Sequence, residues 1–403
     1  MYYLDHAASS PLRPEVLGVY EHAGVLLGNP ASVHAAGRES KALIERAREQ
    51  VARSLGADPI EVVFTGSGTE AVNLAIKGLF WKRGPQDRAV VLVPEGEHHA
   101  TLDTVEWLER HAGAQVVWVP LDHEGRIRLD EWQRALEEYA ARIALASALW
   151  VNNEIGTVQP VAELAAMCAE AGVPLHVDAV AAYGHLPIDL AALRRQSDST
   201  TAGLVAVSLS AHKIGGPQGV GALVVVREAQ LESLIHGGGQ QRKLRSGTED
   251  VLGSMAFGVA AETMVARADT EQAEQQRLRD RLMLELERAF PRARINGSRR
   301  ERVSNNVHIS FPGCESDSLL FLLDQAGVAV SSGSACQAGV IEVSHVVRAL
   351  GYSEDDSRGS LRITLGWTST DADVDALLAA LPEVVARAEA AGHASRTTRF
   401  DRP

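Results

Sequence analysis

The chain has 403 residues, of which 39 are basic and 52 acidic, so its formal net charge is −13; 45% of its residues are hydrophobic. This composition supplies a large core and excludes wholesale disorder. The length suggests two or three domains, or one large domain with an appendage. The negative charge argues against nonspecific binding to nucleic acid or to an anionic membrane, since both require a basic field.

Three cysteines, Cys168, Cys314 and Cys336, are too few for a disulfide framework and fit a reducing compartment. The N-terminus lacks the basic and apolar regions of a signal peptide, and no apolar run approaches the ~20 residues of a membrane span. We therefore expect a soluble, cytoplasmic, globular protein that contacts neither a membrane nor, directly, nucleic acid.

Apolar, β-branched runs alternate with stretches of helical periodicity through the first 230 residues. This alternation implies crossover units and a mostly parallel sheet covered on both faces by helices. The near-continuous apolar character of the strands fits such burial. We expect strands over 62–66, 89–94, 115–120, 143–151, 173–177, 204–209 and 222–226, and helices over 39–55, 69–81, 98–110 and 160–171.

The pattern changes near Gly253. One long connecting helix is expected over 254–290, and a final helix over 372–390. Between them lie strand-like residues 303–311, helix-like residues 317–325 and short apolar segments at 328–331, 344–350 and 361–365. This irregular order predicts a smaller α+β domain. We expect an α/β fold with a large domain over 15–255 and a small domain formed by 1–14 and 256–403.

The segment over residues 208–217, Ser-Leu-Ser-Ala-His-Lys-Ile-Gly-Gly-Pro, follows a buried strand. Burial lowers the pKa of an amine and makes it a nucleophile for carbonyl groups, as a Schiff-base lysine requires. Ser210 and His212 could then donate to a phosphate. Taken alone, Lys213 would more often be a lysine of a surface loop.

Two further features favour a pyridoxal phosphate site. Asp178 ends an apolar strand, where it can face a pyridinium nitrogen, although a helix cap is a common alternative role. The turn at 64–70, Phe-Thr-Gly-Ser-Gly-Thr-Glu, offers backbone N–H groups, a helix dipole and the Thr69 hydroxyl to a phosphate. Such a turn is by itself more often a plain N-cap, and it matches neither the nucleotide P-loop nor the dinucleotide fingerprint.

Adjacent histidines, His98 and His99, begin a predicted helix just after a strand. A metal site is the less favoured interpretation, because neighbouring residues on a helix point in different directions and no Cys/His cluster accompanies them. A ring that lies over a cofactor and moves protons is the favoured role.

Several motifs, in order along nearly the whole chain, resemble those of the group I cysteine desulfurases of the class V aminotransferase superfamily. They are residues 3–8 (Tyr-Leu-Asp-His-Ala-Ala), 28–34 (Gly-Asn-Pro-Ala-Ser-Val-His), 151–156 (Val-Asn-Asn-Glu-Ile-Gly), 245–248 (Arg-Ser-Gly-Thr), 331–336 (Ser-Ser-Gly-Ser-Ala-Cys) and 361–366 (Leu-Arg-Ile-Thr-Leu-Gly). The resemblance implies a fold-type I homodimer with pyridoxal 5′-phosphate. It also implies conversion of L-cysteine to L-alanine with formation of a protein-bound persulfide.

The resemblance also implies a role for each matching residue. Lys213 would form the Schiff base, Asp178 would face the pyridine nitrogen, and His98 would stack on the ring and shuttle protons. Asn153, beside the cofactor, and Arg362 would grip the substrate carboxylate. The phosphate would be held by Gly68, Thr69, Ser210 and His212, with Thr248 reaching it from the other subunit. No residue is assigned to a metal.

Cys336 lies in a run of small residues without an anchoring hydrophobe, which predicts a mobile, exposed loop and a reactive thiol. Its thiolate would attack the substrate sulfur and carry the persulfide to an acceptor protein. Cys168, in an apolar helical stretch, is expected to be a buried core thiol. Cys314, in Phe-Pro-Gly-Cys-Glu, is expected in an exposed turn without a role.

One position departs from the family pattern. The family usually has a glutamine three residues after the strand-end aspartate, donating to the phenolic oxygen of the cofactor, and here Ala181 stands there. A selenocysteine lyase or an aminotransferase of the same fold is the first alternative function. A weakly active or non-catalytic partner in a sulfur-transfer complex is the second. The acceptor is left open among iron–sulfur scaffold proteins, transfer-RNA thiolation enzymes and DNA-sulfur-modification proteins.

Overall fold

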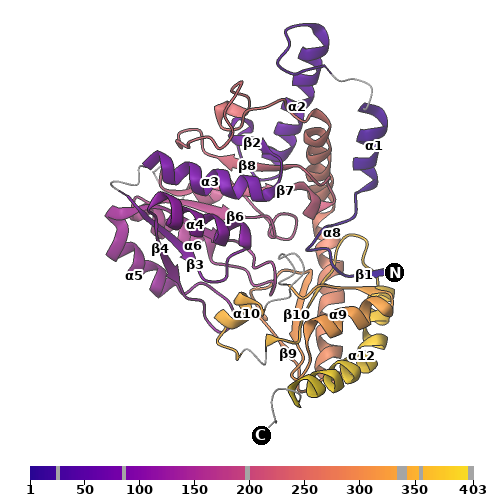
Figure 1. Ribbon diagram of the computed structural model, residues 1–403. Helices are drawn as coiled ribbons and strands as arrows, with labels where there is room; N and C mark the ends of the chain where they lie inside the picture. Colours follow the sequence, from indigo (N-terminus) through magenta and orange to yellow (C-terminus); the bar gives the residue numbers. More distant parts are fainter. Residues whose placement is uncertain (24–27, 84–87, 196–199, 334–342, 354–356, 398–403) are drawn as a thin grey trace.

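The structure is a computed structural model that describes residues 1–23, 28–83, 88–195, 200–333, 343–353 and 357–397. Its larger part is a seven-stranded sheet in the order β2-β8-β7-β6-β5-β3-β4, with helices on both faces (Figure 1). Within this sheet, β8 is antiparallel to both of its neighbours, and the other described pairings are parallel. The expected mostly parallel α/β sheet is confirmed. Its strands are β2 (Val62–Thr65), β3 (Val90–Pro94), β4 (Gln115–Val119), β5 (Ile143–Leu149), β6 (Pro174–Asp178), β7 (Gly203–Ser210) and β8 (Gly221–Val225).

Successive side chains of a strand face opposite sides of the sheet, and here both sides are apolar. Val90 and Leu92 belong to one core cluster, whereas Val91 and Val93 belong to another. The first cluster includes residues of α2 (Ala35–Arg53), α5 (Leu129–Tyr139) and α6 (Val161–Glu170); the second includes residues of α3 (Gly68–Arg83) and α4 (His99–Ala112). The remaining described α-helices before residue 250 are α1 (Pro14–Ala23) and α7 (Leu190–Arg194).

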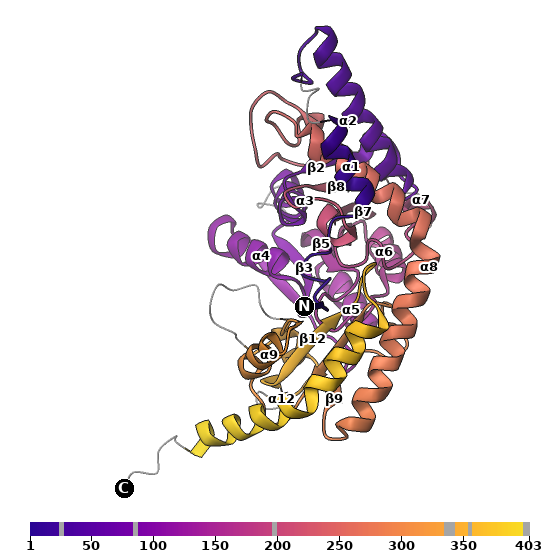
Figure 2. The same cartoon turned by 90° about the vertical axis from the view of Figure 1, so that its right-hand side faces the viewer.

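The long helix α8 (Val251–Ala289) joins the two parts of the molecule, and Figure 2 shows it along one side from α2 down to α12 (Asp371–Thr397). Its first half is apolar enough over 18 residues to resemble a membrane span by composition. The same half contributes Phe257 and Ala260 to the core beneath the large sheet. Burial within the protein therefore accounts for this apolar composition. The second half packs Leu278 and Leu282 into the core of the smaller part.

The smaller part contains a three-stranded antiparallel sheet, β12-β10-β9, and a parallel pair, β1-β11. Leu4 belongs to its core, so the N-terminal segment joins this part as expected. The division into 15–255 and 1–14 with 256–403 stays a prediction; α8 crosses that boundary. The elements are β1 (Tyr2–Tyr3), β9 (Arg294–Ile295), α9 (Ser316–Gln325), β10 (Asn306–Ser310), β11 (Val328–Ala329), α10 (His345–Ala349), β12 (Ser360–Thr364) and α12.

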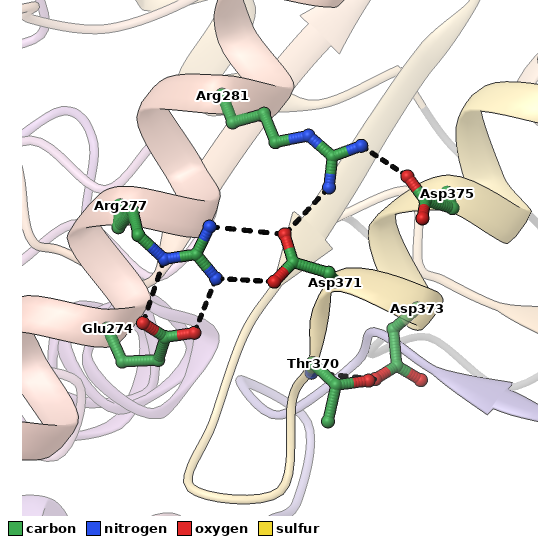
Figure 3. A network of polar contacts seen from close by, with 7 residues as sticks. All are labelled: Glu274, Arg277, Arg281, Thr370, Asp371, Asp373 and Asp375. Atoms are coloured by element: carbon green, nitrogen blue, oxygen red, sulfur yellow. Dashed lines mark hydrogen bonds and ion pairs between the residues drawn. The ribbon is translucent and has the colours of Figure 1, made fainter.

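A network of exposed ion pairs joins α8 to the start of α12 (Figure 3). Arg277 pairs with Glu274 at 2.6 Å and with Asp371 at 2.7 Å. Arg281 pairs with Asp371 at 2.8 Å and also contacts Asp375. Such charges contribute little singly, but as a network they fix α12 against α8.

Cys314 is fully buried, so the expectation of an exposed turn residue is wrong. Its thiol lies 3.8 Å from the carbonyl oxygen of Val385 on α12, and a Cβ added at Gly359 would lie only 3.1 Å from its Cβ. Burial raises the pKa of the Cys314 thiol to about 11. Cys168 is buried as predicted, and burial raises its pKa to about 12.

Candidate active site

A cavity of about 360 Å³ lies at the carboxyl ends of β5, β6 and β7, beside the start of α3, and β12 contributes to its wall. In open α/β sheets this edge is where ligands bind. Nine of the residues predicted from the sequence line it together: Gly68, Thr69, His98, Asn153, Asp178, Ser210, His212, Lys213 and Arg362. The fold therefore brings into one place residues that the chain separates by up to almost 300 positions.

Lys213 lies in a short 3-10 helix, Ala211–Ile214, that directly follows β7. Its Nζ donates to the main-chain oxygen of Ala7 and, at 3.0 Å, to that of Ala8. The amine is therefore held at the cavity wall by the N-terminal segment. This placement of a half-buried amine suits a nucleophile toward a carbonyl group.

Asp178 ends β6 and is 4% exposed. Its Oδ1 accepts from the N–H of Val180 at 2.9 Å. Burial raises the pKa of Asp178 to about 6, and the Val180 N–H and Lys213 act in the opposite direction. A buried carboxyl with so few partners fits a cationic group, such as a pyridinium nitrogen, in the cavity.

The start of α3 fits a phosphate. The N–H groups of Gly68 and Thr69 have no intrahelical acceptor at this end, and no bond from them to another described residue is formed. A Cβ at Gly68 would lie 2.7 Å from Cγ2 of Val180 and 3.2 Å from Cβ of Ser210. At position 68 only glycine fits without displacing a neighbour, and the helix dipole favours an anion at this start of α3.

His98 is the N-cap of α4, and its Nδ1 accepts from the N–H of Ala100 at 3.0 Å. In the neutral ring this contact leaves the proton on Nε2. Burial, with Lys213 as the next contribution, lowers the pKa of His98 to about 4. The same two causes lower the pKa of His212 to about 4. Among the described residues, no group of three His, Cys, Asp or Glu side chains could hold a metal.

Arg362 comes from β12 and is 6% exposed. Its Nη1 donates to the main-chain oxygen of Asn153 at 3.0 Å, and its Nη2 pairs with Oδ1 of Asp5 at 3.1 Å. Residues 3–8 match a family motif in which no role was predicted for Asp5, although residues 5–8 line the cavity. The sequence did offer a sign of this role, because Asp5 directly follows the apolar residue Leu4, which is buried.

The remaining predicted positions have different outcomes. Ala181 lines the cavity, so the missing glutamine side chain would have belonged to the site. Asn153 also lines it, and its side chain makes no hydrogen bond to another described residue. Thr248 is exposed and does not line the cavity of its own chain. Cys336 lies outside the described residues, whereas Ser331 and Gly333, which precede it, line the cavity.

A lysine after one strand, an acid at the end of the next, and a glycine-opened helix start around one cavity define a pyridoxal phosphate-dependent enzyme of fold-type I. The family profile Aminotransferase class-V matches residues 2–377. The IscS-like cysteine desulfurase of Mycobacterium tuberculosis is 44% identical over 98% of this chain and 99% of its own. The cysteine desulfurase IscS of Dictyoglomus turgidum is 38% identical over 95% and 94%.

Solved structures agree with this comparison. A NifS-like protein superposes with a TM-score of 0.85 at 31% identity, over 96% of this chain and 99% of that chain. A NifS-like protein from Rickettsia africae gives a TM-score of 0.84 at 29% identity, over 95% and 99%. The chain belongs to the class-V aminotransferase family, and within it to the pyridoxal phosphate-dependent cysteine desulfurases. These enzymes take sulfur from L-cysteine and pass it to an acceptor.

Proposed function

We propose that desulfuration of L-cysteine takes place in the cavity at the ends of β5, β6 and β7. The observation that carries this proposal is the convergence of Lys213, Asp178 and the open start of α3 on that cavity. When bound there, pyridoxal 5′-phosphate supplies an electron sink for negative charge at the substrate Cα. Gly68, Thr69, Ser210 and His212 would hold its phosphate, and Asp178 its ring nitrogen. A solved relative described as SspA in complex with cysteine, 31% identical, supports the substrate.

Side chains of the cavity would bind the substrate and transfer protons. Arg362 presents a planar guanidinium to the substrate carboxylate, beside Asn153. Lys213 would hold the cofactor through its carbonyl carbon, and its amine could move a proton at the substrate Cα. His98 is neutral near pH 7 and carries its proton on Nε2, so it can donate that hydrogen to a group in the cavity. Taking up a further proton requires Nδ1 to release the N–H of Ala100.

Cys336 accepts the sulfur in this proposal. Its thiolate attacks the substrate sulfur, an S–S bond forms, the carbon–sulfur bond breaks, and the substrate carbon takes up a proton to become L-alanine. Cys336 is three residues beyond Gly333, a cavity-lining residue. Three residues of chain extend at most about 10–11 Å. Cys168 and Cys314 are buried and cannot serve, because burial raises the pKa of each thiol.

The test compares Cys336→Ser with Cys168→Ser and measures L-alanine and sulfide release from L-cysteine. Cys336→Ser is expected to bind the cofactor, shown by its near-visible absorbance, and to release no sulfur, whereas Cys168→Ser should remain active. Full sulfide release by Cys336→Ser would contradict the carrier role and favour a thiol-independent lyase. Lys213→Ala should lose the borohydride-reducible adduct with the cofactor.

Thr248 supports a homodimer in which each cavity is completed by the other subunit. It is exposed and absent from the cavity of its own chain, yet the Arg-Ser-Gly-Thr segment matches the family's phosphate-binding segment. Closed two-fold dimers are the commonest oligomers. Mixing Lys213→Ala chains with Thr248→Ala chains should restore activity above that of either variant alone, since one cavity of the mixed dimer is intact. Activity no higher than the average of the two variants would contradict a shared site.

A further inference from the structure

Glu97, the residue before His98, is a buried carboxyl group that the proposed reaction does not use. It is 1% exposed, and its Oε1 accepts from the N–H of Leu149 at 2.7 Å. Its other oxygen, Oε2, and the hydroxyl of Thr101 are both buried without a hydrogen-bond partner in the described part of the chain. The Thr101 hydroxyl is close enough to the Glu97 carboxyl to act on it, and this hydroxyl and the Leu149 N–H both lower the pKa of Glu97.

A second carboxyl lies close by. Leu149, which donates to Glu97, is paired with Asp178 across β5 and β6. Ionising both of two buried carboxyl groups that lie this close together costs a large free energy. Asp178 has Lys213 as a cationic neighbour, whereas no basic side chain among the described residues acts on the pKa of Glu97. Burial first, and then the charge of Asp178, hold the pKa of Glu97 well above its ordinary value.

We propose that Glu97 is a positioning residue that remains a protonated, neutral carboxylic acid. Its carbonyl oxygen accepts from Leu149, and its O–H donates to Thr101 on the first turn of α4. In that arrangement it fixes His98 at the start of the helix. Of these two carboxyl groups, only Asp178 is then an anion, and it is the one assigned to the ring nitrogen of the cofactor. The inference rests on the roles of Asp178 and His98 in the proposed function.

The main chain around Glu97 is held independently of its side chain. His345 approaches the Glu97 carbonyl oxygen with Nε2 at 2.9 Å. Asn152 donates from Nδ2 to the carbonyl oxygen of Gly96 at 2.9 Å. A variant that changes only the Glu97 side chain keeps these contacts, so we expect it to fold.

Two variants separate a neutral role from a charged one. Glu97→Gln keeps an acceptor for Leu149 and a donor for Thr101 but cannot ionise, and it should retain cofactor affinity and kcat within about threefold. Glu97→Ala leaves the Leu149 N–H buried without its acceptor and should lower both by about tenfold or more. If Glu97→Gln is as impaired as Glu97→Ala, Glu97 acts as an anion and the proposal is wrong.

An infrared measurement on the cofactor-free protein provides a readout apart from activity. At about pH 8 the carbonyl stretch of a protonated carboxylic acid should be present in the wild type and in Asp178→Asn, and absent in Glu97→Gln. Its absence from the wild type overturns the proposal. Asp178→Asn also tests the underlying function, because normal cofactor affinity in this variant would reject the role of Asp178 whatever the state of Glu97.

Discussion

Replacing Gly68 with alanine tests whether the start of α3 is shaped to admit the cofactor phosphate. The added methyl would lie 2.7 Å from Cγ2 of Val180 and 3.2 Å from Cβ of Ser210. The first distance is shorter than carbon atoms tolerate, so Val180 must move, and overpacking of this kind costs about 1–3 kcal/mol. Alanine regains up to about 1 kcal/mol of helix propensity. The net loss of unfolding free energy is therefore expected to be about 0–2 kcal/mol.

The larger effect should fall on the cofactor. Both neighbours that the methyl displaces line the cavity, and Ser210 is one of the residues assigned to the phosphate. A misplaced charged hydrogen bond costs about 1.5–3 kcal/mol, which corresponds to a roughly 10- to 150-fold higher dissociation constant. Absorbance titration of the cofactor-depleted protein measures this constant, and thermal unfolding measures the stability.

Two further variants make the argument refutable. Gly18→Ala, in α1, meets nothing within 4 Å of the new methyl, so it should leave the cofactor dissociation constant unchanged. Val180→Ala removes the clashing Cγ2, so the double variant Gly68→Ala/Val180→Ala should recover about tenfold in affinity over the single variant. An unchanged dissociation constant in Gly68→Ala, or no recovery in the double variant, would refute the view that the cofactor phosphate requires a glycine at position 68 for steric reasons.

Three other predictions concern charged groups. Asp178→Asn should raise the unfolding free energy of the cofactor-free protein near pH 7 by up to about 3 kcal/mol, because burial raises the pKa of Asp178 to about 6 and so penalises its ionised form. In urea unfolding this gain should vanish as the pH falls through 6 toward 4, and a pH-independent gain would contradict the prediction. His98→Asn keeps a side-chain acceptor for the N–H of Ala100, so the melting temperature should fall by no more than about 2 °C. Turnover should nevertheless drop roughly 10²- to 10⁴-fold, and a loss below tenfold would speak against proton transfer by His98. Asp371→Asn removes the carboxylate that Arg277 and Arg281 share. It should lower the melting temperature at low salt, with a smaller difference from the wild type near 1 M salt. A salt-independent difference would rule out an electrostatic origin.

The sequence could predict the site where its chemistry depends on strand ends. Lys213 and Asp178 each follow a buried apolar strand, and parallel strands present their carboxyl ends at one edge of a sheet. The helix start at Gly68 was predictable for the same reason. These residues converge because the sheet order brings their strands together, which local periodicity does not reveal.

Other features depend on contacts that no local pattern encodes. The pairing of Asp5 with Arg362 joins residues 357 positions apart. The exposure of Cys314 was predicted wrongly because its Pro-Gly context is typical of a surface turn, whereas α12 covers it. The helix α5 was also missed, although its pattern is local: its buried residues Trp132, Ala135 and Leu136 have the spacing of an amphipathic helix, and its other face is polar. The position of Glu97 beside Asp178 is likewise a consequence of the packing of α4 on the sheet.

The pairing of Asp5 with Arg362 has a consequence for how the protein is made. The strands of the large sheet end at Val225, so this sheet can assemble on the ribosome before β12 has been synthesised. The first residues of the chain must then wait for Arg362, which emerges among the last. A chain that ends before β12 can form the strands that precede Lys213 and Asp178, but it lacks the guanidinium and the strand against which the N-terminal segment docks. If Arg362 holds the substrate carboxylate as proposed, a chain that ends before β12 cannot bind L-cysteine in the cavity, and desulfuration must await synthesis of this strand.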